Sequence, residues 1–327
     1  MIDKALRYAR TIRYLRMEQV VWRVVHRLYR PRVDQRPAPP QAKGLLQGRG
    51  AWALPLQRES TLVADGVFRF LGVEGDLRDI GWDGPQREKL WRYNQHYFDD
   101  LNAAGADARS KWHAELLANW LLNTTPGQGN GWEPYPTSLR IVNWVKWSLG
   151  GNELPKEALQ SLAIQTRWLS KRLEYHILGN HLFANAKALI HAGIYFKGEE
   201  AERWLRKGLA IVERELPEQV LGDGGHFERS PMYHIVAMED VLDLINLAQS
   251  YPEGERLIGA QVVDTWRDRV TDMARWLRLM CHPDGEISFF NDAAMGSAPS
   301  PAKVIKYAER VLGSEILAEE FVSNIGK

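Results

Sequence analysis

The sequence predicts an all-α fold built from antiparallel helical hairpins, and two observations support this. Apolar residues recur at helical spacing in most segments after residue 86, for example at Val262, Trp266, Val270, Met273 and Leu277. Such helices also recur in pairs roughly every 40 to 50 residues without an exact sequence repeat, as in helical arrays and α/α toroids.

Composition narrows the class of protein. With 45% hydrophobic and 25% charged residues, the 327-residue chain has the composition of a globular protein with one large or two ordinary domains. A net charge of +1 predicts no nucleic-acid partner, and no stretch is apolar for long enough to be an integral membrane segment. The single Cys281 excludes an intrachain disulfide and a cysteine-based metal cluster.

The first 31 residues form a basic stretch with Arg7, Arg10, Arg13 and Arg16 three residues apart. They lack the apolar core of a signal peptide, so a cytoplasmic location is the default expectation, with a bacterial envelope context left open. The stretch could bind a membrane surface. A solvated helix face is favoured, with a buried side packed on the main body and supplied by Leu15, Val20, Val21, Val24 and Val25.

The Pro-rich segment 30–44 breaks this helix and predicts a linker. We therefore expect residues 1–50 to form an N-terminal helix and linker, and residues 51–327 to form the main domain. From 51 to 83 the pattern is short and glycine-punctuated, and "GVFRFLGV" favours one strand. Helices are then expected at 87–102, 110–123, 137–149, 156–177, 180–196, 201–217, 231–250, 261–281 and 302–324.

Consecutive helices joined by short loops are usually antiparallel, so alternate helix starts lie at the same end of the array. Polar and aromatic residues concentrate at these starts and at the loop 282–292, which arrives at the same end. The sequence therefore predicts a cleft for an extended ligand, lined by Tyr93, His96, Tyr135, Arg140, Asn143, Asn180, His181, Tyr233 and His234.

Asn180 and His181 stand at the start of an apolar helical stripe, directly after Gly179. Asn is among the best N-cap residues, so capping is one explanation for Asn180. The alternative is that both side chains face a ligand.

Several kinds of site are disfavoured. "GDGGHF" lacks the lysine and the spacing of a phosphate-binding loop. Four histidines could reach the cleft and hold a metal, but no recognised ligand spacing occurs; they are His181, His226, His234 and His282. Ser230 could be a nucleophile, although an N-cap before Pro231 explains it.

Two chemistries remain. A pair of carboxylates could hydrolyse a glycosidic bond, although ion pairing with Arg229 or Arg140 is the favoured explanation of the candidates Asp223, Glu228, Glu286 and Asp292. Alternatively, Tyr and His could remove the C5 proton of a uronic acid and expel the 4-linked sugar. Tyr233 is then expected to have a lowered pKa, because it lies in a first helical turn near Arg229 and two histidines; otherwise it is a rim aromatic.

Four motifs resemble the heparinase II/III-like polysaccharide lyases, including related alginate lyases: "YPTSLRIVNW", "GNHLFANAKAL", "DGGHFERSPMYH" and "HPDGEISFFND". The resemblance implies that Asn180 neutralises the uronate carboxylate, with His181 beside it, and that Tyr233 is the catalytic acid and base. It also implies subsites lined by Tyr93, His96, Arg140, Asn143, His226 and Arg229.

The resemblance further implies a fold, a partner and the absence of a cofactor. The family has an incomplete α/α toroid followed by an antiparallel β-sandwich, and this sequence ends at Lys327, where the sandwich would begin. The expected partner is an anionic polysaccharide, such as a glycosaminoglycan or alginate-like polymer, cleaved by β-elimination. No redox, nucleotide or metal cofactor is expected in this domain, since the sandwich would hold any zinc.

Overall fold

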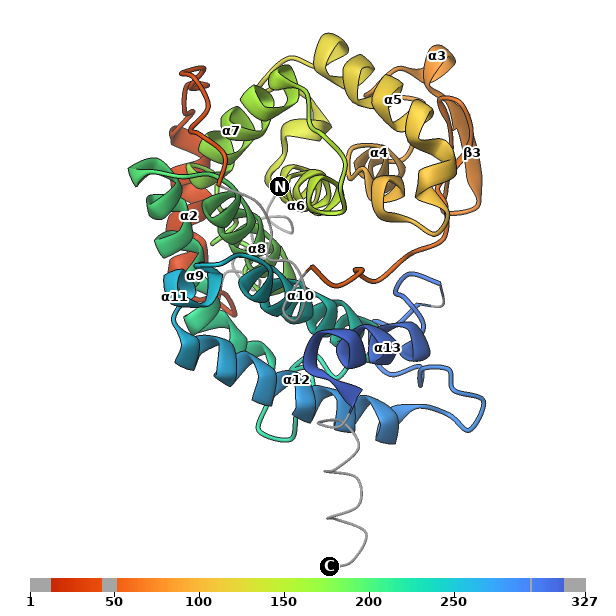
Figure 1. Cartoon of the computed structure of the whole chain (residues 1–327), viewed down its shortest axis with the longest axis vertical. Coiled ribbons are helices and arrows are strands. Elements are labelled where there is room, and N and C mark those ends of the chain that lie inside the picture. Colours follow the sequence, from red (N-terminus) through yellow and green to blue (C-terminus); the bar gives the residue numbers. More distant parts are fainter. Residues whose placement is uncertain (1–12, 43–51, 295, 315–327) are drawn as a thin grey trace, which may run out of the picture.

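The computed structural model describes residues 13–42, 52–294 and 296–314, and shows an open ring of antiparallel helices (Figure 1). Helices on the inner side of the ring are α4 (Lys89–Gln95), α6 (Pro134–Leu149), α8 (Gly179–Tyr195), α10 (Pro231–Ser250) and α13 (Pro301–Leu312). Those on the outer side are α5 (Ser110–Asn123), α7 (Lys156–Ser170), α9 (Glu199–Gln219) and α12 (Ala260–Met280). The all-α class and the incomplete toroid are confirmed.

Among the described residues, three further α-helices and a small sheet accompany the ring. Helices α3 (Leu77–Ile80) and α11 (Gly254–Ile258) are single turns, and α2 (Met17–Leu28) lies outside the ring. Strands β1 (Leu62–Ala64), β2 (Val67–Phe70) and β3 (Val73–Asp76) form an antiparallel sheet in sequence order.

The prediction of one strand over "GVFRFLGV" is wrong, because the segment contains a hairpin turn. Leu71 and Gly72 have φ values of 52° and 75°, and they join β2 to β3. Two successive residues with positive φ match the right-handed twist of the flanking strands.

Two predicted helices are longer than the structure allows. The first is interrupted after α4, because Phe98 adopts a left-handed conformation before the short 3₁₀ helix Asp99–Asn102. The helix expected over 156–177 ends at Ser170. The irregular segment after it is fixed by Asn185, whose Oδ1 accepts a hydrogen bond from the Glu174 backbone N–H at 2.8 Å. The end of the helix predicted over 302–324 lies outside the described residues.

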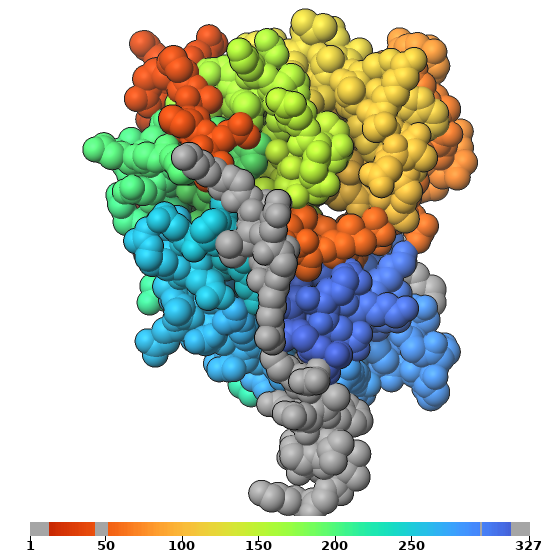
Figure 2. Space-filling view, in the orientation of Figure 1, coloured from red at the N-terminus to blue at the C-terminus, as the bar shows by residue number. Residues whose placement is uncertain are grey.

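The strap, residues 52–62, crosses the opening of the ring and ties its two ends together. Asn246 of α10 pairs with the backbone of Ala53 in both directions, and Arg58 forms a 2.6 Å ion pair with Glu239. At the other end, Asp100 Oδ1 accepts hydrogen bonds from the backbone N–H groups of residues 61 and 62. Figure 2 shows this orange segment lying between the yellow and blue parts of the ring.

The N-terminal helix packs differently from the prediction. Val21 and Val24 of α2, expected to be buried, are exposed, and the helix contacts the body through Trp22 and His26. Residues 30–40 after it have no regular secondary structure, and Arg167 of α7 donates hydrogen bonds to the backbone carbonyls of Arg36 and Pro37. In the described ranges, no helix combines the length and apolarity needed to cross a bilayer.

Candidate active-site cleft

Three inner helices line a cavity of about 190 Å³ with residues at helical spacing. They contribute Tyr135, Leu139, Val142, Asn143 and Lys146 from α6, Asn180, Ala184 and Lys187 from α8, and Val236, Asp240 and Asp243 from α10. A second cavity of about 470 Å³ shares Arg58, Asn94, Asp99 and Ser297 with the first. The two cavities therefore form one cleft beside the strap.

Asn180 lies in the wall of this cleft and is not a helix cap. Helix α8 begins at Gly179, its N-cap is Leu178 with φ of 67°, and no side chain caps it. Asn180 is the second residue of the helix, and its amide forms no hydrogen bond with the described residues. The capping explanation is therefore wrong, and the amide is available to a ligand.

His181 is held beside the cleft by a buried carboxylate. Its Nδ1 lies 3.1 Å from Glu174 Oε1, and its ring centroid is 4.3 Å from that of Tyr135. Glu174 Oε2 in turn accepts a 3.0 Å hydrogen bond from Asn185, which also donates to Ser138. The arrangement fixes the ring orientation and directs Nε2 away from Glu174.

Sequence reasoning missed Glu174 and Asn185. An asparagine in the middle of the apolar segment "LFANAKALI" was the available signal, because a buried amide needs hydrogen-bond partners.

Tyr233 lies in the first turn of α10, on the face of the helix that lines the cleft. It precedes the lining residues Val236 and Asp240 by three and seven positions. Ser230 is the N-cap, as predicted: its Oγ accepts a hydrogen bond from the Tyr233 N–H at 3.3 Å.

The predicted lowering of the Tyr233 pKa is wrong. Partial burial raises this pKa above its usual 10.0, and the carboxylates of Asp292 and Glu228 raise it further. Arg229, the expected source of positive charge, is instead exposed to solvent. The hydroxyl is therefore protonated at neutral pH.

His226 and His234 are both buried, but only His226 lies beside Tyr233. Its ring plane is inclined by 27° to that of Tyr233, with the centroids 6.3 Å apart. Neither ring nitrogen has a hydrogen-bond partner among the described residues. His234 faces α12, where its Nε2 lies 3.0 Å from the Met273 carbonyl oxygen and its ring packs on Trp276. The expectation that His234 contacts a substrate is wrong in this conformation.

Burial lowers the pKa of both histidines to about 4, so both are neutral at pH 7. In the part of the chain that the structure describes, no three His, Cys, Asp or Glu side chains are grouped as metal ligands.

Arg140 and His96 also lie within the protein rather than in the cleft. Arg140 is fully buried, donates from Nε to Gln165 at 2.9 Å, and stacks its guanidinium 4.1 Å from the Trp120 ring centroid. The Trp120 indole N–H donates to His96 Nδ1 at 3.1 Å. The prediction that Arg140 and His96 bind substrate directly is therefore wrong; they position the helices behind the cleft.

Two further predicted residues lie at or near the cleft. Asn143 lines it, and its Nδ2 donates to the Tyr97 carbonyl oxygen at 2.9 Å and to Asp99 Oδ1 at 2.7 Å. Tyr93 is half-buried and donates from its hydroxyl to Glu133; burial and this carboxylate both raise its pKa.

The inner end of the cleft contains a buried cluster of charges. Asp243 Oδ2 lies 2.9 Å from Lys146 Nζ and 2.6 Å from Lys187 Nζ, and Oδ1 accepts a hydrogen bond from the Tyr307 hydroxyl. Burial opposes ionisation of Asp243, but the two lysines outweigh it and hold its pKa well below the usual range. Sequence reasoning missed this cluster, although charges inside "NWVKWSL" and "VLDLINL" are unusual for apolar helices.

The carboxylates considered for hydrolysis are not neutralised as expected. Burial raises the pKa of Glu228, and the charge of nearby Asp292 raises it further. Within the described residues neither forms an ion pair with Arg229 or Arg140, so that interpretation is wrong for this pair.

Comparison with known proteins gives a consistent set of similarities. Residues 144–314, more than half of the chain, match the family model described as "Heparinase II/III N-terminus". A heparin-sulfate lyase of Bacteroides stercoris is 40% identical over 78 residues, which are 24% of this chain and 12% of the relative. A heparin-sulfate lyase of Pedobacter heparinus is 27% identical over 172 residues, covering 44% of this chain and 26% of the relative.

The solved structure of a heparan sulfate lyase HepC mutant from Pedobacter heparinus has the same fold. The two superpose with a TM-score of 0.52 at 20% identity, over 78% of this chain and 44% of that one. This chain therefore spans less than half the length of the proteins that it matches.

Proposed function

Because this chain belongs to the heparinase II/III family, we propose that its cleft binds a uronic-acid-containing polysaccharide and cleaves it by β-elimination. The main support for the proposal is the Asn180 side-chain amide, which lies in the cleft wall without a hydrogen-bond partner among the described residues. Next to it, His181 is held by the buried carboxylate of Glu174. The relatives named as heparin-sulfate lyases support a sulfated glycosaminoglycan as the first substrate to try.

The proposed step removes the C5 proton of the uronate and breaks the bond between C4 and its glycosidic oxygen. The electrons of the C5–H bond form the C4=C5 double bond, and the departing oxygen takes a proton. Asn180 donates hydrogen bonds from its amide to the uronate carboxylate. The imidazolium form of His181, with Nδ1–H on Glu174, donates to it from Nε2, and both contacts stabilise the enolate-like charge as the proton leaves. Tyr233 exchanges the proton, as base at C5 and then as acid at the leaving oxygen.

The raised pKa of Tyr233 has two consequences for this step. Little tyrosinate exists at neutral pH, but each tyrosinate is a stronger base than one with an ordinary pKa. The proton that it accepts is then bound firmly enough to require a strongly basic acceptor, such as a departing alkoxide.

A hydrolytic cleft is the second candidate, and the pair Glu228 and Asp292 favours it. A carboxyl group with a raised pKa beside a second carboxylate is the arrangement that glycosidases use as acid and base. In this case Asn180 and Tyr233 bind the sugar without exchanging protons.

The two candidates are separated by incubating the chain with a panel of uronic polymers that starts with heparan sulfate. Elimination leaves a C4=C5 bond conjugated to the carboxylate, so ultraviolet absorbance rises together with new reducing ends. New reducing ends without that absorbance support hydrolysis and contradict the lyase proposal. Binding without new ends on any polymer supports a non-catalytic cleft.

A further inference from the structure

Helix α2 has its apolar stripe on the side that faces away from the protein. Met17, Val21, Val24 and Leu28 follow one another at spacings of four, three and four, so they share one face of the helix. Their exposed fractions are 75%, 49%, 53% and 78%, and no residue of α2 is buried. A helix of a globular domain normally turns such a stripe toward the core.

The opposite face is fastened to the body, so the orientation of the helix is fixed. Trp22 stacks on Tyr175 with centroids 4.9 Å apart, and His26 packs on His176 at 4.6 Å. Gln19 donates to the Ile177 carbonyl oxygen at 3.2 Å.

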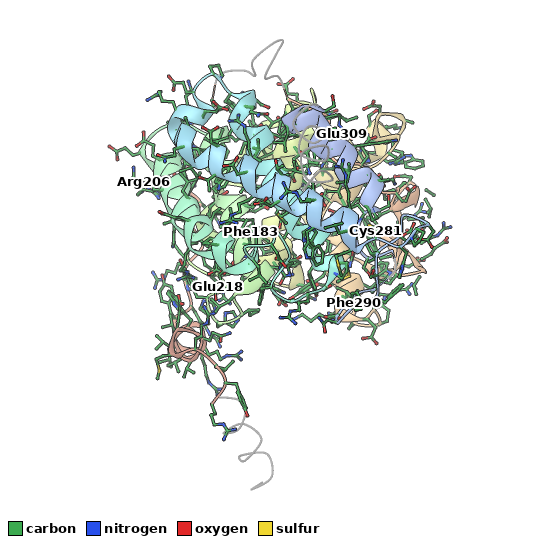
Figure 3. The ribbon with its side chains drawn as sticks, turned by 90° about the horizontal axis from the view of Figure 1, so that it is seen from below. Phe183, Arg206, Glu218, Cys281, Phe290 and Glu309 are labelled. Atoms are coloured by element: carbon green, nitrogen blue, oxygen red, sulfur yellow. The ribbon has the colours of Figure 1, made fainter. Side chains whose placement is uncertain are left out.

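Ion pairs fasten the sides of the same helix. Arg16 pairs with Glu218, and Glu18 pairs with Arg214 at 3.0 Å. Figure 3 shows α2 nearly end-on at the margin of the molecule, below the labelled Glu218. Contacts with described residues on three sides of the helix leave the apolar stripe exposed.

Positive charge lies at both ends of this helix. Arg13 lies before the helix, and Arg27, Arg30 and Arg32 lie at its C-terminal end; all four are exposed, and none pairs with a carboxylate among the described residues. The one carboxylate of the helix, Glu18, is already paired with Arg214. Exposed tyrosines, Tyr14 and Tyr29, flank the stripe at its two ends.

We infer that α2 binds the surface of an anionic lipid bilayer, lying in the plane of the interface with Met17, Val21, Val24 and Leu28 inserted among the acyl chains. Helices that lie in a membrane interface combine an apolar stripe with basic residues near it and aromatic rings at its ends. Each arginine near an anionic surface contributes about 1 kcal/mol to binding, or roughly a fivefold gain in affinity.

A lipid surface fits this face better than a protein partner does. A 12-residue helix is about 18 Å long, and one stripe on it provides far less than the roughly 800 Å² per partner of a stable protein interface. A bilayer needs no complementary shape and supplies both an apolar layer and negative charge. This inference is independent of the proposed function.

The test is co-sedimentation of the 327-residue chain with vesicles of phosphatidylcholine, with and without 30% phosphatidylglycerol. We expect binding to the anionic vesicles that weakens as salt is added and is at least tenfold weaker on pure phosphatidylcholine. The double variant Val21→Asp/Val24→Asp should bind at least tenfold less well. The matched control is Leu122→Asp/Leu279→Asp, which places the same two charges at exposed apolar positions away from α2.

Three results would overturn the inference. Equal binding by the double variant and the control would place the lipid contact elsewhere. Absence of binding to anionic vesicles, with circular dichroism showing an intact fold, would exclude a lipid surface. A dimer in light scattering that Val24→Asp dissociates would assign the stripe to a second copy of the chain.

Discussion

The polar residues of the cleft differ in how much freedom the fold leaves them. The Asn180 amide has no partner among the described residues, whereas His181 is held by Glu174 and Asn143 is held by Asp99. A group that stabilises charge only in a transition state acts best when it is already oriented and costs no reorganisation. His181 meets that condition through Glu174, and Asn180 requires the substrate carboxylate to complete its hydrogen bonds.

Asn180→Asp should abolish elimination with little change in stability. A second carboxylate would repel the uronate carboxylate, while the fold loses no hydrogen bond that the present amide makes. Because Asn180 is not a cap, Asn180→Ala should also avoid the loss of about 1 kcal/mol that follows removal of a cap. Ultraviolet assay and thermal unfolding of both variants measure this; an active Asn180→Asp enzyme would exclude the carboxylate role.

Tyr233→Phe should lower kcat by about 10²–10⁴ while polymer binding is nearly unchanged, because only the proton-exchanging hydroxyl is lost. Since the tyrosinate is the base and its pKa is raised above 10.0, kcat/KM of the wild-type chain should rise about tenfold per pH unit from about pH 7 to about pH 9. A Phe variant within a few-fold of wild type, or a rate that levels off near neutral pH, would assign the base to another residue.

At the scale of elements, the three inner helices that line the cleft, α6, α8 and α10, bring their first turns together at its mouth. Tyr135 and His181, from the first turns of α6 and α8, are in ring contact, and Tyr233 lies in the first turn of α10. Helix N-termini carry partial positive charge, so their convergence favours an anionic ligand at the mouth. At the other end of the cleft, Asp243 of α10 joins the same three helices through two lysines.

Asp243→Asn should destabilise the fold by about 3–5 kcal/mol, because it leaves two buried ammonium groups without their shared partner. The matched control is Glu199→Gln, which breaks an exposed pair with Arg203 and should cost less than about 1 kcal/mol. Urea unfolding at pH 7 gives both values. Similar losses for the two variants would show that the buried cluster contributes no more than a surface pair.

Sequence periodicity predicted the helices well, because most of them bury one apolar side and their starts carry recognisable signals such as Ser230 before Pro231. It could not predict where a polar residue points once the helix is buried on every side. Arg140 and Asn143 are three residues apart on α6, yet Arg140 packs on Trp120 and Asn143 reaches the cleft. The charged cluster was missed for the same reason, since its members meet only through tertiary packing.

For the whole molecule, buried histidines set the dependence of stability on pH. The folded chain holds His26, His191, His226 and His234 with pKa values of about 4, 3, 4 and 4, chiefly because of burial. The unfolded chain protonates histidine near pH 6.5, so it takes up more protons than the folded chain between about pH 6.5 and pH 4. The free energy of unfolding should therefore fall as the pH is lowered through that window.

At about 1.4 kcal/mol per pH unit, lowering the pKa of His234 from 6.5 to about 4 corresponds to roughly 3 kcal/mol of lost stability at pH 4. Urea unfolding at pH 7, 6 and 5 checks the trend. The variant His234→Leu removes one of the proton acceptors and should show a smaller slope. A free energy of unfolding that is constant from pH 7 to pH 5 would contradict the assignment of these histidines as buried and neutral.

The strap also has a consequence for the order in which the chain folds. Its contacts join residues separated by 181, 193 and 244 positions, as in Arg58 with Glu239, Ala53 with Asn246, and Glu59 with Lys303. Helical hairpins form from neighbouring residues and therefore early, whereas contacts of such long range require most of the chain to be ordered beforehand. Arg58 is part of the cleft wall, so we expect the complete binding surface to form only at the last stage of folding, when the ring closes.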